Sequence, residues 1–354
     1  MILRERPAWS GLALARTAPP RDAVFSNYSR EILASALRST LARHRNDGRV
    51  IIPNFVCNTL IDAVLAAGGQ AVFHGLDPDL TPRLNEVEAL LDRGAAAWLV
   101  VDYFGMQPEI PPALLEKARS TGCVIIHDGA HSFLSLMTNS ERAVSGFDYS
   151  VFSVYKSLAI GCGAIGIGGV PMTQGVSLMH MVMMAARKVA KHAVATMAKG
   201  RFVNRGMERL QRLSPEPIRP RGGSAAGVAV VRFLVRHRDY ARVAARHFDA
   251  AERIAAAASA ARLDIVFDAA QRRDNVLQGF PLRLESQALR DQLLAYFRRH
   301  RIDAYTWPTF STLGGDEPLW ARLVVLPVHP RVAEVLAAFR SSSPGKFGAP
   351  NRTD

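Results

Sequence analysis

Polar residues of different chemistry follow two short apolar runs, Cys123–Ile126 and Tyr149–Phe152. In chain order they are Asp128, His131, Ser153 and Lys156. Apolar, β-branched runs of this length are typical of buried strands. Parallel strands bind ligands at their carboxyl ends, so we expect these side chains at one site. A carboxylate, an imidazole, a hydroxyl and an amine together suit a phosphorylated, nitrogen-containing ring cofactor.

Lysine-bound pyridoxal phosphate (PLP) would use each of these groups. Its chemistry requires a lysine amine that forms a Schiff base and then moves protons. It requires a carboxylate beside the pyridine nitrogen, because an anion there favours the protonated ring that withdraws electrons best. It also requires hydroxyl and backbone N–H groups around the phosphate. Lys156 and Asp128 are the candidates for the first two roles.

Each candidate has an ordinary alternative. Asp128 could cap a helix, and Lys156 could be a surface lysine in a loop; on its own stretch the two interpretations of Lys156 are equal. Lys156 stands out because it alone directly follows an apolar strand. The other lysines fall on expected helices or in the tail: Lys117, Lys188, Lys191, Lys199 and Lys346.

A candidate anion site lies upstream, where Phe25–Arg30 leads into apolar residues at helical spacing. Ser29 and Arg30 are therefore expected at a helix N-terminus. Unpaired backbone N–H groups and the helix dipole favour an anion there. A plain serine N-cap is the alternative, and on this stretch alone it is the stronger one.

The first half of the chain alternates between strand and helix patterns, which indicates helices over a mostly parallel sheet in a three-layer α/β domain. Strands are expected at Val50–Ile52, Ala71–Phe73, Trp98–Tyr103, Cys123–Ile126, Tyr149–Phe152 and Ala164–Gly169, and helices at Thr59–Ala67, Leu84–Leu91 and Pro112–Thr121.

The second half predicts a smaller α+β domain. Residues 175–212 are interpreted as a helix linking two domains, with a membrane-surface helix as the alternative. Helices are expected at Ala225–Val235, Tyr240–Ala258, Ser286–His300 and Val332–Phe339, and strands at Val276–Leu284, Ile302–Thr306 and Arg322–Pro327. We divide the chain into an irregular arm (1–25), a large cofactor-binding domain (26–200), a small domain (201–340) and a disordered tail (341–354).

The composition of the chain limits the classes of partner, metal site and cellular location that we expect. The 354 residues carry a net charge of +13, but the arginines are scattered and no nucleic-acid-binding motif accompanies them, so nucleic acid is not expected. The 3 cysteines are too few for a disulfide framework or zinc site, and no metal is expected. The N-terminus lacks a signal-peptide core, and no apolar segment is long enough to span a bilayer. We expect a cytoplasmic protein.

The sequences HDGAHSF (127–133) and DYSVFSVYKSLAIGCG (148–163) resemble the cofactor core of DegT/StrS-type (DegT/DnrJ/EryC/StrS) sugar aminotransferases. These enzymes belong to the PLP-dependent aspartate aminotransferase superfamily, fold type I. PNFVC (53–57), DYFGMQP (102–108) and LPVHP (326–330) follow in the family's order. The resemblance spans residues 25–340.

The resemblance implies a role for each candidate residue. Lys156 would form the Schiff base, Asp128 would pair with the pyridine nitrogen, and His131 would contact the ring near its hydroxyl. Phosphate would be bound by Ser153, Ser29 and Arg30.

This sequence also departs from the family's pattern. Cys57 stands where the family often has a ring-stacking aromatic residue, a role that Phe55 could supply. Ser29 and Arg30 replace a Gly-Thr pair. Segment 221–224 is a positional match for the asparagine-bearing segment that a partner subunit donates.

Function follows from the same resemblance. It implies a PLP-dependent aminotransferase, working as a homodimer, that transfers an amino group from glutamate to a nucleotide-linked keto sugar in polysaccharide or glycan precursor synthesis. A lyase or dehydratase on the same scaffold is one alternative, although the family's sugar dehydratases carry a histidine where Lys156 stands. A non-catalytic basic binding protein is the other, motivated by the net charge of +13.

Overall fold

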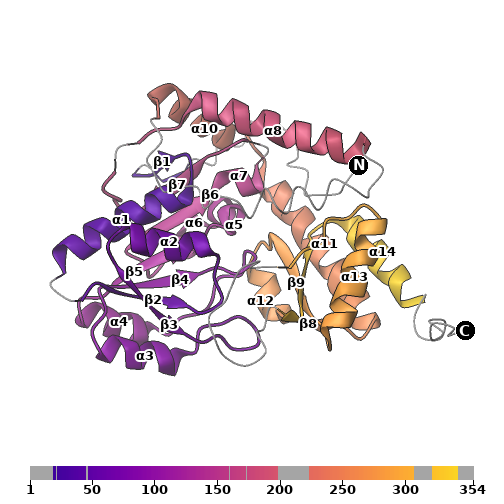
Figure 1. Ribbon diagram of the computed structural model, residues 1–354, viewed down its shortest axis with the longest axis horizontal. Coiled ribbons are helices and arrows are strands. Elements are labelled where there is room, and N and C mark those ends of the chain that lie inside the picture. Colours follow the sequence, from indigo (N-terminus) through magenta and orange to yellow (C-terminus); the bar gives the residue numbers. More distant parts are fainter. Residues whose placement is uncertain are drawn as a thin grey trace, which may run out of the picture.

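The computed structural model describes residues 19–20, 22–44, 47–158, 160–172, 174–197, 223–306 and 321–341. These residues form a seven-stranded and a three-stranded sheet, each with its own helices (Figure 1). The expected boundary at residue 200 lies outside the described residues, as do most of the arm and of the tail. The division into domains therefore stays a prediction.

The large sheet has the strand order β1-β7-β6-β5-β4-β2-β3. The strands are β1 (Val24–Ser26), β2 (Arg49–Pro53), β3 (Gln70–His74), β4 (Ala97–Val101), β5 (Val124–Asp128), β6 (Tyr149–Ser153) and β7 (Ala164–Ile167). Pairings from β3 through β6 are parallel, whereas β7 is antiparallel to β6 and to β1. The expected α/β class with a mostly parallel sheet is confirmed.

Side chains that alternate along the strands cover both faces of this sheet. Helices α1 (Ser29–Arg43) and α2 (Asn58–Ala66) pack on one face, where Ile126 is part of the largest core cluster. Helices α3 (Leu84–Asp92) and α4 (Pro112–Ser120) pack on the other, against the neighbouring Ile125 (Figure 1). This gives the expected three layers.

Four further helices belong to the large-sheet region. Short helices follow β5 and β6, and a long one follows β7: α5 (Phe133–Thr138), α6 (Ser140–Val144), α7 (Val154–Ser157) and α8 (Leu178–Met197). Of the helix expected over 175–212, residues 198–212 lie outside the described part of the chain.

The small sheet is antiparallel, in the order β10-β9-β8. Its strands are β8 (Asp264–Ile265), β9 (Gly279–Arg283) and β10 (Leu323–Pro327), and the accompanying helices are α10 (Ala225–Arg236), α11 (Tyr240–Ala260), α12 (Ala269–Asp274), α13 (Gln287–Arg299) and α14 (Pro330–Ser341). The strand expected at Ile302–Thr306 is wrong as a strand. The described residues there form isolated bridges at Ile302 and Tyr305, the latter to Val325, rather than a continuous strand.

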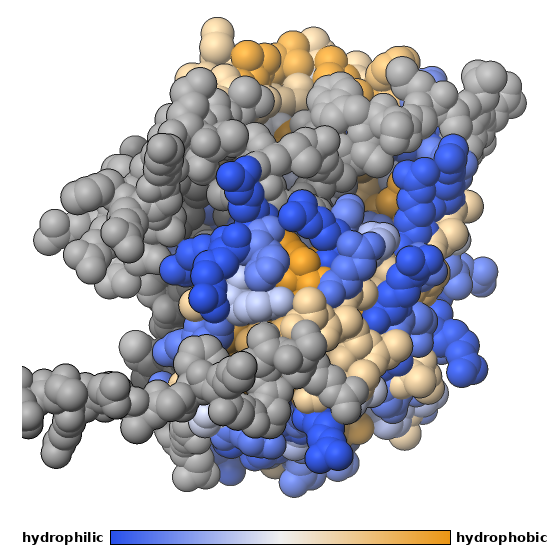
Figure 2. All heavy atoms as spheres, turned by 90° about the vertical axis from the view of Figure 1, so that its right-hand side faces the viewer, coloured by the Kyte–Doolittle hydropathy of each residue, from blue (hydrophilic) through white to orange (hydrophobic). Residues whose placement is uncertain are grey.

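Helices α8 and α10 carry an exposed apolar surface. Met179, Val182 and Met183 recur at helical spacing on α8, with 71%, 63% and 51% of their surface exposed. Val230 and Phe233 are exposed on α10. Figure 2 shows apolar side chains gathered along the top of the molecule, where Figure 1 places these two helices. None of the described helices has the length and apolar character that a bilayer span requires.

Candidate active site

Two neighbouring parallel strands deliver the acid and the amine. β5 ends at Asp128, which pairs in register with Val151 of β6. β6 ends at Ser153, and the short helix α7 that follows places Lys156 within one turn of the strand end. Asp128 and Lys156 are both half-buried. The sheet therefore brings the two residues to the same edge, as the sequence predicts.

The charges of these two groups act on each other. Burial lowers the pKa of the Lys156 amine, and the negative charge of Asp128 opposes that shift. Burial raises the pKa of the Asp128 carboxyl, and the positive charge of Lys156 opposes it in turn. A lowered pKa makes more of the amine available as the unprotonated nucleophile near neutral pH.

The ordinary alternatives for both residues do not match their surroundings. Asp128 does not cap a helix, because its Oδ1 accepts the Ala130 N–H at 3.1 Å and α5 begins only at Phe133. Lys117 shows what a surface lysine of this chain looks like, since its Nζ pairs with two helix carboxylates at 2.9 and 2.8 Å. Lys156 instead lies with an acid at the end of a buried strand.

His131 lies beside the pair as a neutral imidazole. Burial, reinforced by the charge of Lys156, holds its pKa well below the ordinary value. The backbone N–H of Phe104 donates to Nδ1 at 3.3 Å, and the Phe104 ring stacks on the imidazole with ring centroids 6.0 Å apart. Because Nδ1 accepts, the ring proton belongs on Nε2, which makes His131 a hydrogen-bond donor to a site ligand.

Two hydroxyls mark the start of α1. Ser29 is the first residue of that helix and Tyr28 is its N-cap, without a side-chain cap. The Oγ atoms of Ser29 and Ser153 lie 2.9 Å apart. The serine therefore does not cap its helix, and its hydroxyl instead joins that of Ser153 beside the N-terminal N–H groups of α1. This is a suitable anion cradle.

Arg30 lies in a different contact. Its guanidinium carbon is 4.6 Å from the centre of the Tyr28 ring, and Tyr28 meets Tyr155 edge-on with ring centroids 5.5 Å apart. Tyr28 Oη is 2.6 Å from His180 Nε2 on α8. Arg30 is still near enough to lower the pKa of Tyr155, which burial raises. Arg30 therefore lies beside the aromatic cluster of Tyr28 and Tyr155, and its positive charge acts on the site from there.

The position expected to stack on a cofactor ring is Cys57, which precedes α2 as its N-cap. Its Sγ lies 3.1 Å from Thr59 Oγ1. Burial lowers the pKa of Lys156, and Cys57 is one of the groups that oppose this shift. Phe55 is 2% exposed and stacks on Tyr103 with ring centroids 5.8 Å apart. Cys57 therefore lies near enough to the amine to affect its pKa, and Phe55 is packed against Tyr103.

A residue that the sequence did not single out ties the small sheet to the lysine. Gln278, which precedes β9, donates from Nε2 to the Lys156 carbonyl at 3.1 Å, and its backbone N–H donates to the Phe104 carbonyl at 2.7 Å. Gly105 permits this approach, because a Cβ there would lie 2.6 Å from the Val276 carbonyl oxygen. Proximity of this kind depends on tertiary docking, for which the sequence has no local signal.

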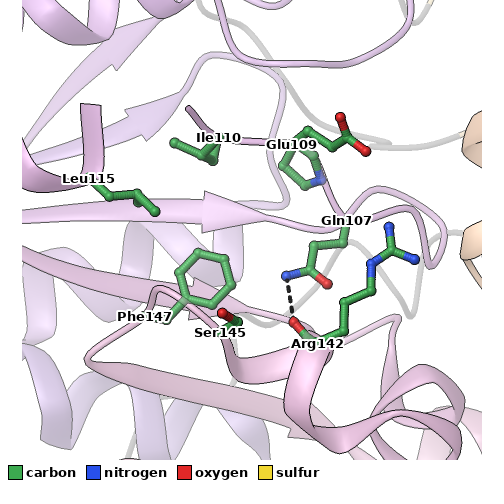
Figure 3. Close-up of a pocket in the computed structure, with 8 residues that line it drawn as sticks. Gln107, Glu109, Ile110, Leu115, Arg142, Ser145 and Phe147 are labelled. Carbon is green, nitrogen blue, oxygen red and sulfur yellow. Dashed lines mark hydrogen bonds between the residues drawn. The ribbon is translucent and has the colours of Figure 1, made fainter. Parts of the chain in front are cut away.

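A separate pocket lies on the α4 and α6 side of the sheet and contains none of the predicted site residues (Figure 3). Gln107, Arg142 and Phe147 line it, among others, and Gln107 Nε2 donates to the Arg142 carbonyl at 3.4 Å. The Arg142 guanidinium forms an ion pair with Asp274 at 4.0 Å. We assign this pocket no part in cofactor binding.

An amine, a carboxylate, a neutral imidazole and a hydroxyl-lined helix start fit pyridoxal phosphate, since each meets a different need of that molecule. This fold and donor set define the class of PLP-dependent transferases. A family model described as the DegT/DnrJ/EryC1/StrS aminotransferase family matches residues 31–210. The chain belongs to that family of PLP-dependent aminotransferases, and the sequence resemblance is confirmed.

Solved structures share the fold at low sequence identity. Helicobacter pylori PseC, an aminotransferase involved in the biosynthesis of pseudoaminic acid, is 12% identical with a TM-score of 0.62, covering 91% of this chain and 87% of its own. The putative sugar aminotransferase Spr1654 from Streptococcus pneumoniae in its PMP form is 14% identical with a TM-score of 0.60, covering 94% and 90%. DesI, solved in the presence of its TDP-sugar product, is 18% identical with a TM-score of 0.59, covering 90% and 80%. No curated protein matches the chain in sequence.

Proposed function

We propose that this aminotransferase moves an amino group from glutamate to a nucleotide-linked keto sugar, with Lys156 and Asp128 as its central residues. The observation that carries the proposal is their meeting at adjoining strand ends, where the charge of each shifts the pKa of the other. A nucleotide-linked sugar as the acceptor is supported by the family and by DesI, which was solved in the presence of its TDP-sugar product. Polysaccharide or glycan precursor synthesis in the cytoplasm is the setting we infer.

Each residue then has one task. The bound cofactor supplies an electron sink for the carbon that loses its proton. Lys156 would hold the cofactor covalently between turnovers and would move the proton at the carbon next to the nitrogen. Asp128 would accept a hydrogen bond from the pyridine nitrogen, and His131 would donate from Nε2 to the ring hydroxyl. Ser29 and Ser153 would donate to the phosphate.

The helix pair α8 and α10 supports the proposed homodimer. Five apolar side chains lie exposed there, namely Met179, Val182, Met183, Val230 and Phe233. Covering such a surface removes apolar area from water, and a second copy of the chain is the occupant that the family suggests. The contact between His180 on α8 and Tyr28 beside the phosphate turn links this surface to the site.

Transfer of ¹⁵N-labelled glutamate nitrogen to a panel of nucleotide-linked keto sugars tests the reaction. We expect labelled amino sugar and 2-oxoglutarate in equal amounts, and none with Lys156→Ala. Glutamate alone should also convert the bound cofactor to its amine form, which tests the donor without knowledge of the sugar. Sugar dehydration without nitrogen transfer would contradict the proposal and favour a dehydratase.

A further inference from the structure

Asp102 and His127 form a buried pair directly behind Asp128. Asp102 follows β4, and His127 is the penultimate residue of β5. Asp102 Oδ1 lies 2.8 Å from His127 Nε2, and both side chains are 0% exposed. We propose that this pair is a positioning device for Asp128, which fixes the carboxylate and balances the charge around it. The inference rests on the role proposed above for Asp128.

Backbone geometry connects the pair to Asp128. His127 immediately precedes Asp128, and alternation along a strand directs their side chains to opposite faces of the sheet. The backbone N–H of Asp102 donates to the Asp128 carbonyl at 3.1 Å. The pair therefore links β4 to the end of β5, on the face of the sheet opposite to the Asp128 side chain.

Aromatic rings close the pair off from water. Phe147 stacks on the His127 imidazole with ring centroids 4.4 Å apart, and Phe152 meets it edge-on at 5.5 Å. A Cβ at Gly129 would lie 2.5 Å from Phe152 Cε1 and 2.9 Å from His127 Cε1, so glycine at this position leaves room for both rings. Phe147 also lines the pocket of Figure 3 and thus separates it from the pair.

Neither member of the pair has an alternative partner among the described residues. The contact has the distance of an ion pair, although its alignment falls outside that of a hydrogen bond, and within the described part of the chain Asp102 Oδ2 and His127 Nδ1 have no hydrogen-bond partner. A single buried charge costs far more than a buried pair. Selection for fold stability alone would be met more simply by two apolar residues.

The pair acts on the charge of Asp128 with opposing signs. Burial raises the pKa of Asp128 most; of the pair, His127 lowers that pKa and Asp102 raises it. The other titratable groups near Asp128 are Lys156 and Tyr155 on α7, Tyr103 after β4 and His131 after β5. Removal of His127 alone would leave Asp102 as an uncompensated negative charge, which favours a protonated Asp128.

The test follows the visible absorption of the PLP-loaded enzyme as the pH is varied. It measures the midpoint, which is the pH at which half of the absorption change has occurred. We expect His127→Gln to raise this midpoint by about one pH unit. Adding Asp102→Asn, which removes the uncompensated carboxylate, should return it to the wild-type value. A purely structural role would change stability without this sign-dependent rescue. An unmoved midpoint in His127→Gln, or a rise that persists in the double variant, would overturn the proposal.

Matched variants distinguish an effect of this pair from the loss of any buried histidine. His74→Gln is the control, because His74 is a buried neutral histidine on β3 at the far edge of the sheet, and its loss should leave the midpoint unchanged. If His127→Gln does not fold, the single variant Asp102→Asn provides the test. We expect it to raise the dissociation constant of PLP about tenfold, and an unchanged dissociation constant would refute the pair's role.

Asp128→Asn, measured in parallel, separates the pair's role from that of Asp128 itself. If this variant leaves PLP affinity and the midpoint intact, the proposed role of Asp128 fails. If it disturbs them while the variants of Asp102 and His127 do not, only the pair proposal fails.

Discussion

The hydroxyls of Ser29 and Ser153 lie 2.9 Å apart, although 124 positions separate the two residues in the chain. One begins α1 and the other ends β6, so their meeting depends on the packing of that helix against the sheet. Two donors and a helix N-terminus at one point form a site for a dianion.

Replacement of either serine by alanine should weaken PLP binding by about 10- to 100-fold, which is the usual range for a lost hydrogen bond to a charged group. Because the hydroxyls share one anion, the double variant should lose less than the sum of the single losses. Equilibrium dialysis of PLP measures this. Ser39→Ala, farther along α1, is the control and should bind normally. A normal affinity in both single variants would refute the cradle.

Gly105 should tolerate alanine much less well than Gly68, although both have positive φ, +95° and +83°. A Cβ at Gly105 meets the backbone of Val276 and Gln278 at 2.6 and 2.9 Å, whereas Gly68 has nothing within 4 Å. We expect about 1 kcal/mol of backbone strain in Gly68→Ala and a further ~1–3 kcal/mol of overpacking in Gly105→Ala. Urea unfolding compares them, and equal losses would show that this junction can relax.

His131 should make the cofactor-free protein sensitive to acid. Its folded-state pKa lies well below the unfolded value, so the unfolded chain binds more protons once the pH falls below about 6.5. Stability should therefore fall with acidification, by up to about 1.4 kcal/mol per pH unit from this residue. His131→Gln removes this contribution and should show a shallower loss between pH 6.5 and 5. Identical slopes would contradict a neutral, half-buried His131.

The apolar surface on α8 and α10 should be the dimer contact. Met183 is 51% exposed in the single chain. Met183→Glu would bury a charge in the dimer contact and should weaken dimerisation at least about tenfold. Light scattering after size-exclusion chromatography measures the mass. Leu65→Glu, on α2 and 59% exposed, is the control. A Met183→Glu protein that remains dimeric would place the interface elsewhere.

The sequence predicted the α/β architecture because hydrophobic periodicity is a local property that each strand and helix carries in its own residues. It missed β1, which has only three residues, and it predicted a strand near Tyr305 where the described residues form isolated bridges. Short elements of this kind are set by what they pack against, and a short apolar run cannot reveal its partner.

The candidate site shows the same limit. Asp128 and Lys156 could be placed together because each follows a recognisable strand. The Asp102–His127 pair could not, since its contact depends on the lateral register of β4 and β5. Charged residues at the ends of two apolar strands were the available signal. Gln278 had none, because it reaches Lys156 only through docking of the small sheet.

The proposed aminotransferase activity depends most directly on Lys156 as the residue that holds the cofactor. The PLP-loaded enzyme can be reduced with borohydride, which makes the lysine–cofactor link permanent, and then digested for peptide mass spectrometry. We predict one cofactor mass per chain, on the peptide that contains Lys156, and none in Lys156→Ala. Labelling of another lysine, or no labelling of a protein that has taken up PLP, would contradict the account.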